Sequence, residues 1–201
     1  MRRHHTVIIS VQTGCSMHCV GCSVTKPGPP KKYDKLLGEI NRSLAIGDRR
    51  GGGEKISELN IIFGCPGEST FNNDILFLCL HLASKSKEYN IKFIPTLSTM
   101  GPTTNAKFET FIKYYLAFKS QQKGNAILEV RVADDLYPNA HPINELQHIL
   151  LRAVDSEGLT GHPINIVYHP ESTPQFIKKL HKLFKPCNFS VKKAIDFWGS
   201  L

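Results

Sequence analysis

The sequence predicts an α/β protein in which parallel strands alternate with helices that lie outside the sheet. Short runs rich in β-branched residues alternate with longer amphipathic runs along the chain. The chain has 201 residues, 41% of them hydrophobic, which is enough to bury one large core. Five or six strand–helix units are too few for a closed eight-stranded barrel. We therefore expect an open partial barrel or a doubly wound sheet, built as a single domain over residues 1–201.

The expected strands are runs of β-branched and aromatic residues bounded by polar residues, Gly or Pro. The first reads Thr-Val-Ile-Ile-Ser-Val, and the later ones have the same character. Strands are expected at 6–11, 59–63, 91–97, 127–133 and 164–168, with a shorter one at 189–192.

Between the strands, apolar residues recur every three or four positions, which is the pattern of a helix with one buried face. Helices are expected at 33–46, 73–87, 105–119, 143–154 and 174–185. The last begins with Thr173 as its N-cap and Pro174 at its first position. The segment 47–55, rich in Gly, Arg and Lys, is expected to be a surface loop.

Three cysteines stand close together in the loop after the first strand. Cys15, Cys19 and Cys22 are separated by three and then two residues. Such a loop can present three thiolates to a cubane iron–sulfur cluster, because soft thiolates are the ligands of this chemistry. Three ligands leave one of the four irons open to the amine and carboxylate of S-adenosylmethionine (SAM). We therefore expect a [4Fe–4S] cluster and SAM, which together generate a 5′-deoxyadenosyl radical.

Two other interpretations of the three cysteines remain. With His18 they could hold a structural zinc ion in a nucleic-acid-binding domain, although His18 adjoins Cys19 and both can hardly reach one tetrahedral ion. The thiols could also lie together by chance and bind no metal.

Polar residues follow the later strands at the same edge of the expected sheet, where ligands of parallel α/β folds bind. Gly67 lets the backbone approach a ligand closely, and Glu68 could accept hydrogen bonds from the ammonium group of SAM. Ser98 and Thr99 could reach a ribose or carboxylate, and His169 ends the fifth strand. The alternative for each loop is an ordinary turn or helix cap.

The other cysteines are weaker candidates for chemistry. Cys65 lies in the Gly-rich loop before Glu68, and Cys187 precedes the last strand, so either could be a catalytic thiol. Cys79 falls on the apolar face of a helix and is expected in the core.

These motifs resemble the radical SAM superfamily, and most closely the dual-specificity RNA adenine methyltransferases. Residues 9–15 read Ile-Ser-Val-Gln-Thr-Gly-Cys, Gly67–Glu68 resembles the family's Gly-Glu pair, and residues 98–101 resemble its Ser-Thr-Ser-Gly loop. The resemblance implies a partial (β/α)6 barrel, a cluster on the three cysteines, and an electron donor such as flavodoxin or ferredoxin. It also implies modification of RNA, a nucleotide or a peptide.

The chain departs from that family at three places. Gly21 replaces the usual aromatic residue before the third cysteine, and the loop before Glu68 is one residue longer. If the tails align, Trp198 stands where the family has its methyl-carrying cysteine, and a Trp cannot be that covalent carrier. A non-catalytic sensor or partner subunit that binds the cluster or SAM is therefore the alternative to an enzyme.

Charge favours anionic partners. Lys and Arg number 25 against 17 Asp and Glu, a net charge of +8, and Lys26, Lys31, Lys32 and Lys35 follow the cysteine segment. This rim could receive phosphates or an acidic electron-transfer protein. The alternative is an ordinary solvated loop on a surface that is basic without such a partner. No apolar run approaches the roughly 18 to 20 residues that span a bilayer, and no signal peptide is recognisable. We expect a cytoplasmic protein with reduced cysteines and no membrane partner.

Overall fold

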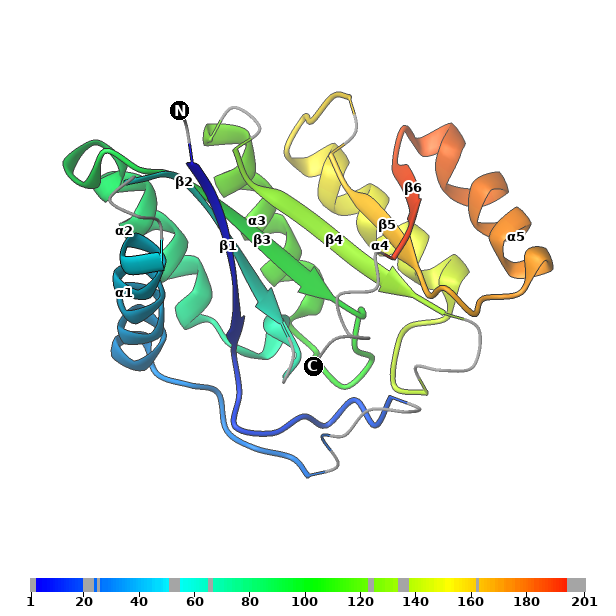
Figure 1. The fold of residues 1–201 in the computed structure, drawn as a ribbon. Coiled ribbons are helices and arrows are strands. Elements are labelled where there is room, and N and C mark those ends of the chain that lie inside the picture. The colour runs from blue at the N-terminus through cyan, green and yellow to red at the C-terminus, as the bar shows by residue number, and fades with distance from the viewer. Residues whose placement is uncertain are drawn as a thin grey trace.

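Strand and helix alternate from β1 to β6 in the computed structural model, which describes residues 3–19, 24, 26–50, 55–64, 67–122, 125–133, 138–161 and 163–194 (Figure 1). The strands are β1 (Arg3–Ser10), β2 (Ile56–Gly64), β3 (Lys92–Thr99), β4 (Ile127–Val132), β5 (Asn165–Tyr168) and β6 (Ser190–Lys193). The helices are α1 (Tyr33–Arg50), α2 (Asp74–Tyr89), α3 (Phe108–Gln121), α4 (Ile143–Ser156) and α5 (Pro174–Phe184). Two short 3-10 turns, η1 (Ser69–Phe71) and η2 (Lys185–Cys187), complete the set.

The six strands lie side by side in chain order, β1-β2-β3-β4-β5-β6, and every neighbouring pair is parallel. Two parallel neighbouring strands are joined by a crossover connection, which is almost always right-handed. Because each crossover here leads to the next strand on the same side, all the helices lie on one face of the sheet. Figure 1 shows this arrangement, with the helices behind the curved sheet. A doubly wound sheet would reverse its strand order, so the expected partial (β/α)6 barrel is confirmed.

The core lies between the helices and the face of the sheet that they cover. β4 shows the required alternation, because Leu128, Val130 and Val132 are buried in the hydrophobic cluster while the residues between them are not. Tyr115 of α3 is fully buried, and its hydroxyl reaches the carbonyl oxygens of Pro95 at 2.8 Å and Ile127 at 3.0 Å. Burial raises the pKa of Tyr115 well above its usual value.

Two elements extend beyond the bounds that the sequence pattern predicts, β1 toward the N-terminus and α1 toward the C-terminus. β1 begins at Arg3, because His4 pairs with Glu58 of β2 and their side chains meet at 2.7 Å. α1 continues to Arg50, into the segment expected to be a loop. Gly47 allows this because it packs on β2: a Cβ there would lie 2.6 Å from the Ile56 Cδ1 atom.

α3 starts at Phe108 and not at the expected position 105. Asn105 holds the preceding turn instead, since its Oδ1 atom accepts a hydrogen bond from the Lys107 N–H at 3.0 Å. Its Nδ2 atom donates to the Thr70 carbonyl at 2.7 Å, which joins this turn to the loop after β2. A local side-chain turn therefore replaces the first helical turn.

Among the described helices, none has the length and apolar character needed to cross a membrane.

Candidate functional site

The loops that carry the expected site residues meet at one end of the sheet, the C-terminal edge, where β1, β2 and β3 finish. The segment 11–31 follows β1 and contains the cysteines; we call it the cysteine loop. Gly67 and Glu68 follow β2, and Met100 follows β3. Because the strands are parallel neighbours, their ends bring these three loops together.

The base of the cysteine loop is closed by backbone hydrogen bonds. The Cys15 N–H donates to the Lys26 carbonyl at 2.9 Å, and the Thr13 N–H donates to the Pro29 carbonyl at 3.1 Å. Gly14 and Gly28 cross at this base, and a Cβ on either one would overlap backbone atoms of the facing strand of the loop. Only glycine fits there, so the loop has a fixed neck.

Two of the three cysteines lie in the described residues, and Cys22 lies outside them. Cys15 is 7% exposed, and Cys19 is partly exposed, with its Sγ atom 3.1 Å from the Met100 Sδ atom. This contact joins the cysteine loop to the end of β3. His18 is exposed and has a left-handed backbone, with φ of 52°.

A second contact holds the cysteine loop from the side of β4. The Nδ2 atom of Asn139, in the segment before α4, donates to the carbonyls of Ser16 at 3.0 Å and Met17 at 3.3 Å. The Met17 side chain is fully buried. Sequence reasoning missed Asn139, since nothing in its neighbourhood signals a partner more than a hundred residues away.

Glu68 ties the loops after β2 and β3 together. Its Oε1 atom accepts hydrogen bonds from the Thr70 N–H at 3.1 Å, the Thr70 hydroxyl at 2.9 Å and the Thr99 hydroxyl at 2.6 Å. Its Oε2 atom accepts from the Met100 N–H at 2.9 Å. Glu68 is 2% exposed, and burial raises the pKa of its carboxyl, although these hydrogen bonds oppose the shift.

Gln12 links this network to the neck of the cysteine loop. Its Oε1 atom accepts a hydrogen bond from the Glu68 N–H at 2.7 Å, and its Nε2 atom lies 3.5 Å from the Gly28 carbonyl. Gly67 has a φ of +112°, and a Cβ there would lie 2.8 Å from Gln12 Cβ, so glycine is required. Asn72 completes the junction, because its Nδ2 atom donates to the carbonyls of Val11 and Lys31, both at 2.9 Å.

The remaining expected residues have different surroundings. Ser98 is 8% exposed, and its hydroxyl accepts a hydrogen bond from the Arg131 Nε atom at 2.8 Å. Thr99 uses its hydroxyl within the protein, donating to Glu68 and accepting from the Gly101 N–H at 3.1 Å. His169 stands just past β5, where its Nδ1 atom accepts from the Glu171 N–H at 3.3 Å. Contacts of these residues with SAM stay predictions.

The topology separates Cys187 from the site. It ends η2, between the end of α5 and the start of β6, and therefore lies at the N-terminal edge of the sheet, opposite the cysteine loop. This placement contradicts a role for Cys187 as a catalytic thiol of the site. Cys79 is 1% exposed in the core, as expected, and burial raises its pKa. Cys65, Gly21 and Trp198 lie outside the described residues.

The described part of the cysteine loop holds two of the three thiols that the sequence predicts as cluster ligands. The described residues contain no group of three or more His, Cys, Asp or Glu side chains arranged to hold a metal. They do place Cys15 and Cys19 in one loop with a fixed neck, and they place Cys19 beside the sulfur of Met100. Thiolates are the ligands of iron–sulfur clusters, so these two residues fit the expected group, and the cluster itself stays a prediction.

Comparison with solved structures gives similar folds at low sequence identity. Native anSMEcpe with bound AdoMet and the Cp18Cys peptide matches at TM-score 0.60 and 16% identity, over 94% of this chain. Native anSMEcpe with bound AdoMet matches at TM-score 0.61 and 17% identity, over 96% of this chain. A radical SAM methyltransferase from Sphaerobacter thermophilus matches at the lower TM-score of 0.48 and 15% identity, over 94% of this chain and 65% of that one.

The chain spans about half the length of the first two neighbours, 50% and 52%. No protein-family model matches the chain, and no curated protein matches its sequence. The likeness therefore concerns the arrangement of strands and helices. On that arrangement, the chain shares its parallel partial-barrel fold with anSMEcpe.

Proposed function

We propose that this protein is a radical SAM enzyme whose cysteine loop holds a [4Fe–4S] cluster and whose C-terminal edge binds SAM. The observation that carries the proposal is the closed neck of the cysteine loop at the end of β1, directly joined to the turns after β2 and β3. When bound, the cluster would supply the electron that breaks a carbon–sulfur bond of SAM and releases a 5′-deoxyadenosyl radical.

The chain's own residues would bind and orient these groups. Cys15, Cys19 and Cys22 are the proposed cluster ligands. The buried Glu68 carboxylate fixes the backbone of the Gly67 turn relative to Thr99 and so shapes the place of the methionine end of SAM. We assign the proposed contact with the SAM amine to the Oε2 atom of Glu68. This oxygen accepts one hydrogen bond from the protein, whereas Oε1 accepts three.

Ser98 and Arg131 form the proposed site for the carboxylate or ribose of SAM. The Arg131 Nε atom donates a hydrogen bond to the Ser98 hydroxyl and holds it in place. Arg131 brings a positive charge to the face of β4 opposite its buried residues. Guanidinium groups bind carboxylates through charge-assisted hydrogen bonds. His169 is proposed as a more distant contact at the end of β5.

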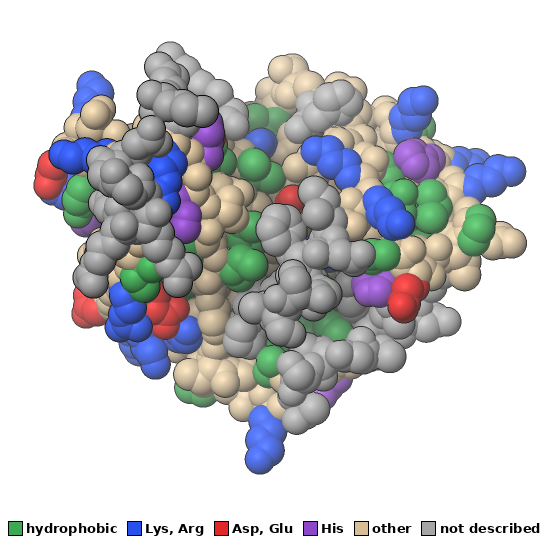
Figure 2. Space-filling view, viewed as in Figure 1, with side chains coloured by type: hydrophobic (Ala, Val, Ile, Leu, Met, Phe, Trp, Pro, Cys, Tyr) green, Lys and Arg blue, Asp and Glu red, His purple; other side chains and the backbone are tan. Residues whose placement is uncertain are grey.

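The proposed electron donor is a flavodoxin or ferredoxin, and the proposed substrate is RNA, a nucleotide or a peptide. Lys26, Lys32 and Lys35 are exposed beside the cysteine loop and at the start of α1. Figure 2 shows Lys and Arg side chains on this flank of the molecule. Lys31 does not share that role, because it pairs with Glu39 at 2.8 Å. An acidic electron-transfer protein or a phosphate backbone would complement the exposed lysines.

The test is anaerobic reconstitution with iron and sulfide, followed by SAM and dithionite, with 5′-deoxyadenosine measured by chromatography. The proposal expects this product from the wild type and its loss in Cys15→Ala and Cys19→Ala. Cys187→Ala is the matched control, because this cysteine lies at the other edge of the sheet.

The same experiment separates the alternatives. Iron uptake without 5′-deoxyadenosine would favour the non-catalytic sensor or partner subunit. Zinc in place of iron would favour the zinc-stabilised nucleic-acid-binding domain. A methylated cysteine after turnover, found by mass spectrometry, would assign RNA methylation through a covalent carrier.

A further inference from the structure

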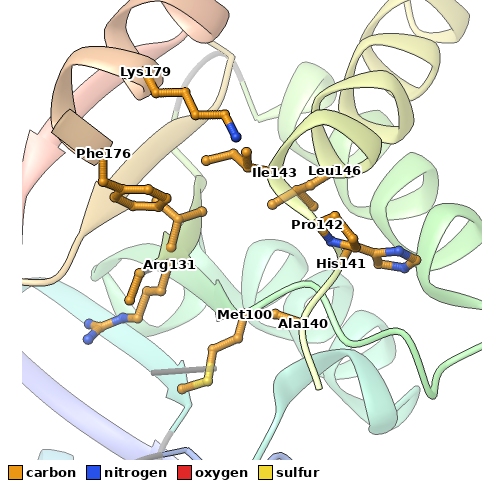
Figure 3. Close-up of a pocket in the computed structure, with 11 residues that line it drawn as sticks. Met100, Arg131, Ala140, His141, Pro142, Ile143, Leu146, Phe176 and Lys179 are labelled. Carbon is orange, nitrogen blue, oxygen red and sulfur yellow. The ribbon is translucent and has the colours of Figure 1, made fainter. Parts of the chain in front are cut away.

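A cavity of about 380 Å³ lies beside the candidate site, between α4 and α5 (Figure 3). Its inner end is lined by Met100 and Arg131, and its outer end by Phe176 and Lys179. The volume falls within the roughly 300 to 1,000 Å³ of small-molecule sites.

The inner end of the cavity reaches the proposed cofactor site. Met100 Sδ lies 3.1 Å from the Cys19 Sγ atom, so the residue that lines the cavity also contacts the cysteine loop. Arg131 lines the cavity while its Nε atom donates to Ser98 at 2.8 Å. A molecule in the cavity would therefore lie next to the place proposed for SAM.

The outer end of the cavity is cationic. Lys179 extends from α5 toward Ile143 of α4 (Figure 3), and it has no ion-pair partner in the part of the chain that the structure describes. Lys178 and Lys182 of α5 and Lys192 of β6 are also exposed, and Figure 2 shows Lys and Arg side chains over these two elements. Such a cluster raises the local concentration of anions.

The walls between the two ends are apolar. Phe176 of α5 faces Ile143 and Leu146 of α4 across the cavity (Figure 3). His141 also lines the cavity, but its ring points away from the centre and packs on Phe108, with ring centroids 5.7 Å apart. A half-buried aromatic ring beside a free ammonium group can bind a flat apolar body that carries an anionic head group.

We propose that this cavity binds the substrate of the radical reaction, and that the substrate is a small organic anion. Its phosphate or carboxylate head group would lie at Lys179, and its flat apolar body would pack on Phe176. The proposal rests on the proposed function, since it places the substrate next to the SAM site. It narrows the substrate to an anion-bearing small molecule such as a nucleotide.

The test measures binding to the full chain without SAM, at low salt, by nuclear magnetic resonance titration. The probes are phenyl phosphate, benzoate and the neutral benzyl alcohol, which share one ring and differ in the head group. We expect a dissociation constant on the order of 1 mM for at least one of the two anions. Benzyl alcohol should bind at least about tenfold more weakly. The tighter of the two anions identifies the head group as phosphate or carboxylate.

Three variants test whether the probes bind at Lys179 and Phe176. Lys179→Gln should weaken anion binding about five- to tenfold, and Phe176→Leu should weaken all three probes a few-fold. Lys178→Gln is the matched control, an exposed neighbour on the same helix that does not line the cavity, and should stay within about twofold. Equal binding of benzyl alcohol and the anions, equal losses in the two Lys variants, or no binding of any probe would overturn the proposal.

These results separate the two proposals. Anion binding that depends on Lys179, in a protein that does not cleave SAM, would keep the binding site and remove the radical chemistry. SAM cleavage without anion binding would support the proposed radical SAM function and contradict the proposal that the substrate is a small organic anion.

Discussion

Two glutamates at the ends of β2 have opposite surroundings. Glu58, near the start of the strand, has a side chain 26% exposed and contacts His4 at 2.7 Å and Lys92 at 3.2 Å. Glu68, just past the end of the strand, is 2% exposed and accepts its hydrogen bonds from uncharged groups. Burial raises the pKa of Glu68. At Glu58 burial is the largest single influence and raises the pKa, but the hydrogen bonds and charges of His4 and Lys92 together outweigh it, so the pKa is lowered.

The difference shows that this fold buries hydrogen-bonded polar side chains at the C-terminal edge of the sheet, and leaves an ion pair exposed at the other edge. A buried polar group destabilises a protein unless it is hydrogen-bonded, whereas surface ion pairs contribute little in either direction. Among the described residues, the buried polar side chains at or next to the C-terminal edge are Gln12, Glu68, Ser69, Thr70, Asn72, Ser98 and Thr99. Such a network holds loops in one arrangement, which a cofactor site requires.

The largest effect is expected when the buried carboxylate is removed. Glu68→Ala leaves the Thr70 and Met100 N–H groups without their acceptor and should lower the free energy of unfolding by about 3 kcal/mol. Glu58→Ala, at the other end of the strand, should lower it by less than about 1 kcal/mol. Urea unfolding followed by circular dichroism measures both. Equal losses in the two variants would show that the two edges do not differ as described.

The neck of the cysteine loop should be the next most sensitive point. Gly28→Ala places a methyl group against the Gly14 backbone. It should lower the free energy of unfolding by about 2 kcal/mol and abolish most of the iron uptake. Gly38→Ala is the matched control, because Gly38 lies in α1 and has no atom within 4 Å of its would-be Cβ. That change should stabilise the protein by up to about 1 kcal/mol. Normal iron uptake in Gly28→Ala would argue against a fixed neck.

The site could be predicted from the sequence where its residues are close together in the chain. The spacing of Cys15, Cys19 and Cys22 and the Gly67–Glu68 pair are local patterns. The contacts of Gln12, Asn139 and Arg131 could not be predicted, because each joins segments that only the folded sheet brings together. The internal use of the Glu68 carboxylate depends on Thr99, 31 residues further along the chain.

The fold was predictable because strand and helix patterns alternate regularly, and its class is confirmed. The boundaries were less predictable, since tertiary contacts decide them. Pairing with β2 extends β1 to Arg3, and packing of Gly47 on Ile56 lets α1 continue through a segment rich in Gly and charge. The position of Cys187 likewise follows from strand direction and not from its neighbours in the sequence.

A smaller effect is expected at the second attachment of the cysteine loop. Asn139→Ala removes the hydrogen bonds to the Ser16 and Met17 carbonyls and should lower the free energy of unfolding by about 1 kcal/mol. Hydrogen exchange measured by mass spectrometry should show faster exchange in the peptide that contains the cysteine loop. Unchanged exchange there would mean that the neck alone fixes the loop.

The smallest effect is the pH dependence of stability. The raised pKa of Glu68 means that its contribution to stability is complete below the unfolded value of 4.5 and is lost as pH rises through the folded pKa. The lowered pKa of Glu58 acts in reverse: its contribution is present above 4.5 and is lost as pH falls through the folded pKa.

Urea unfolding between about pH 3 and pH 7 can measure both effects. As pH rises, the wild type should lose stability relative to Glu68→Gln and gain stability relative to Glu58→Gln. The same trend in both variants would contradict the opposite shifts.

Electron paramagnetic resonance of the reconstituted, dithionite-reduced protein tests the central claim most directly. We predict about four irons per chain and a signal of a reduced [4Fe–4S] cluster whose g-values change when SAM is added. The signal should be absent from Cys15→Ala and Cys19→Ala and retained in Cys187→Ala. A protein that binds zinc in place of iron, or a cluster signal that SAM leaves unchanged, would contradict the account.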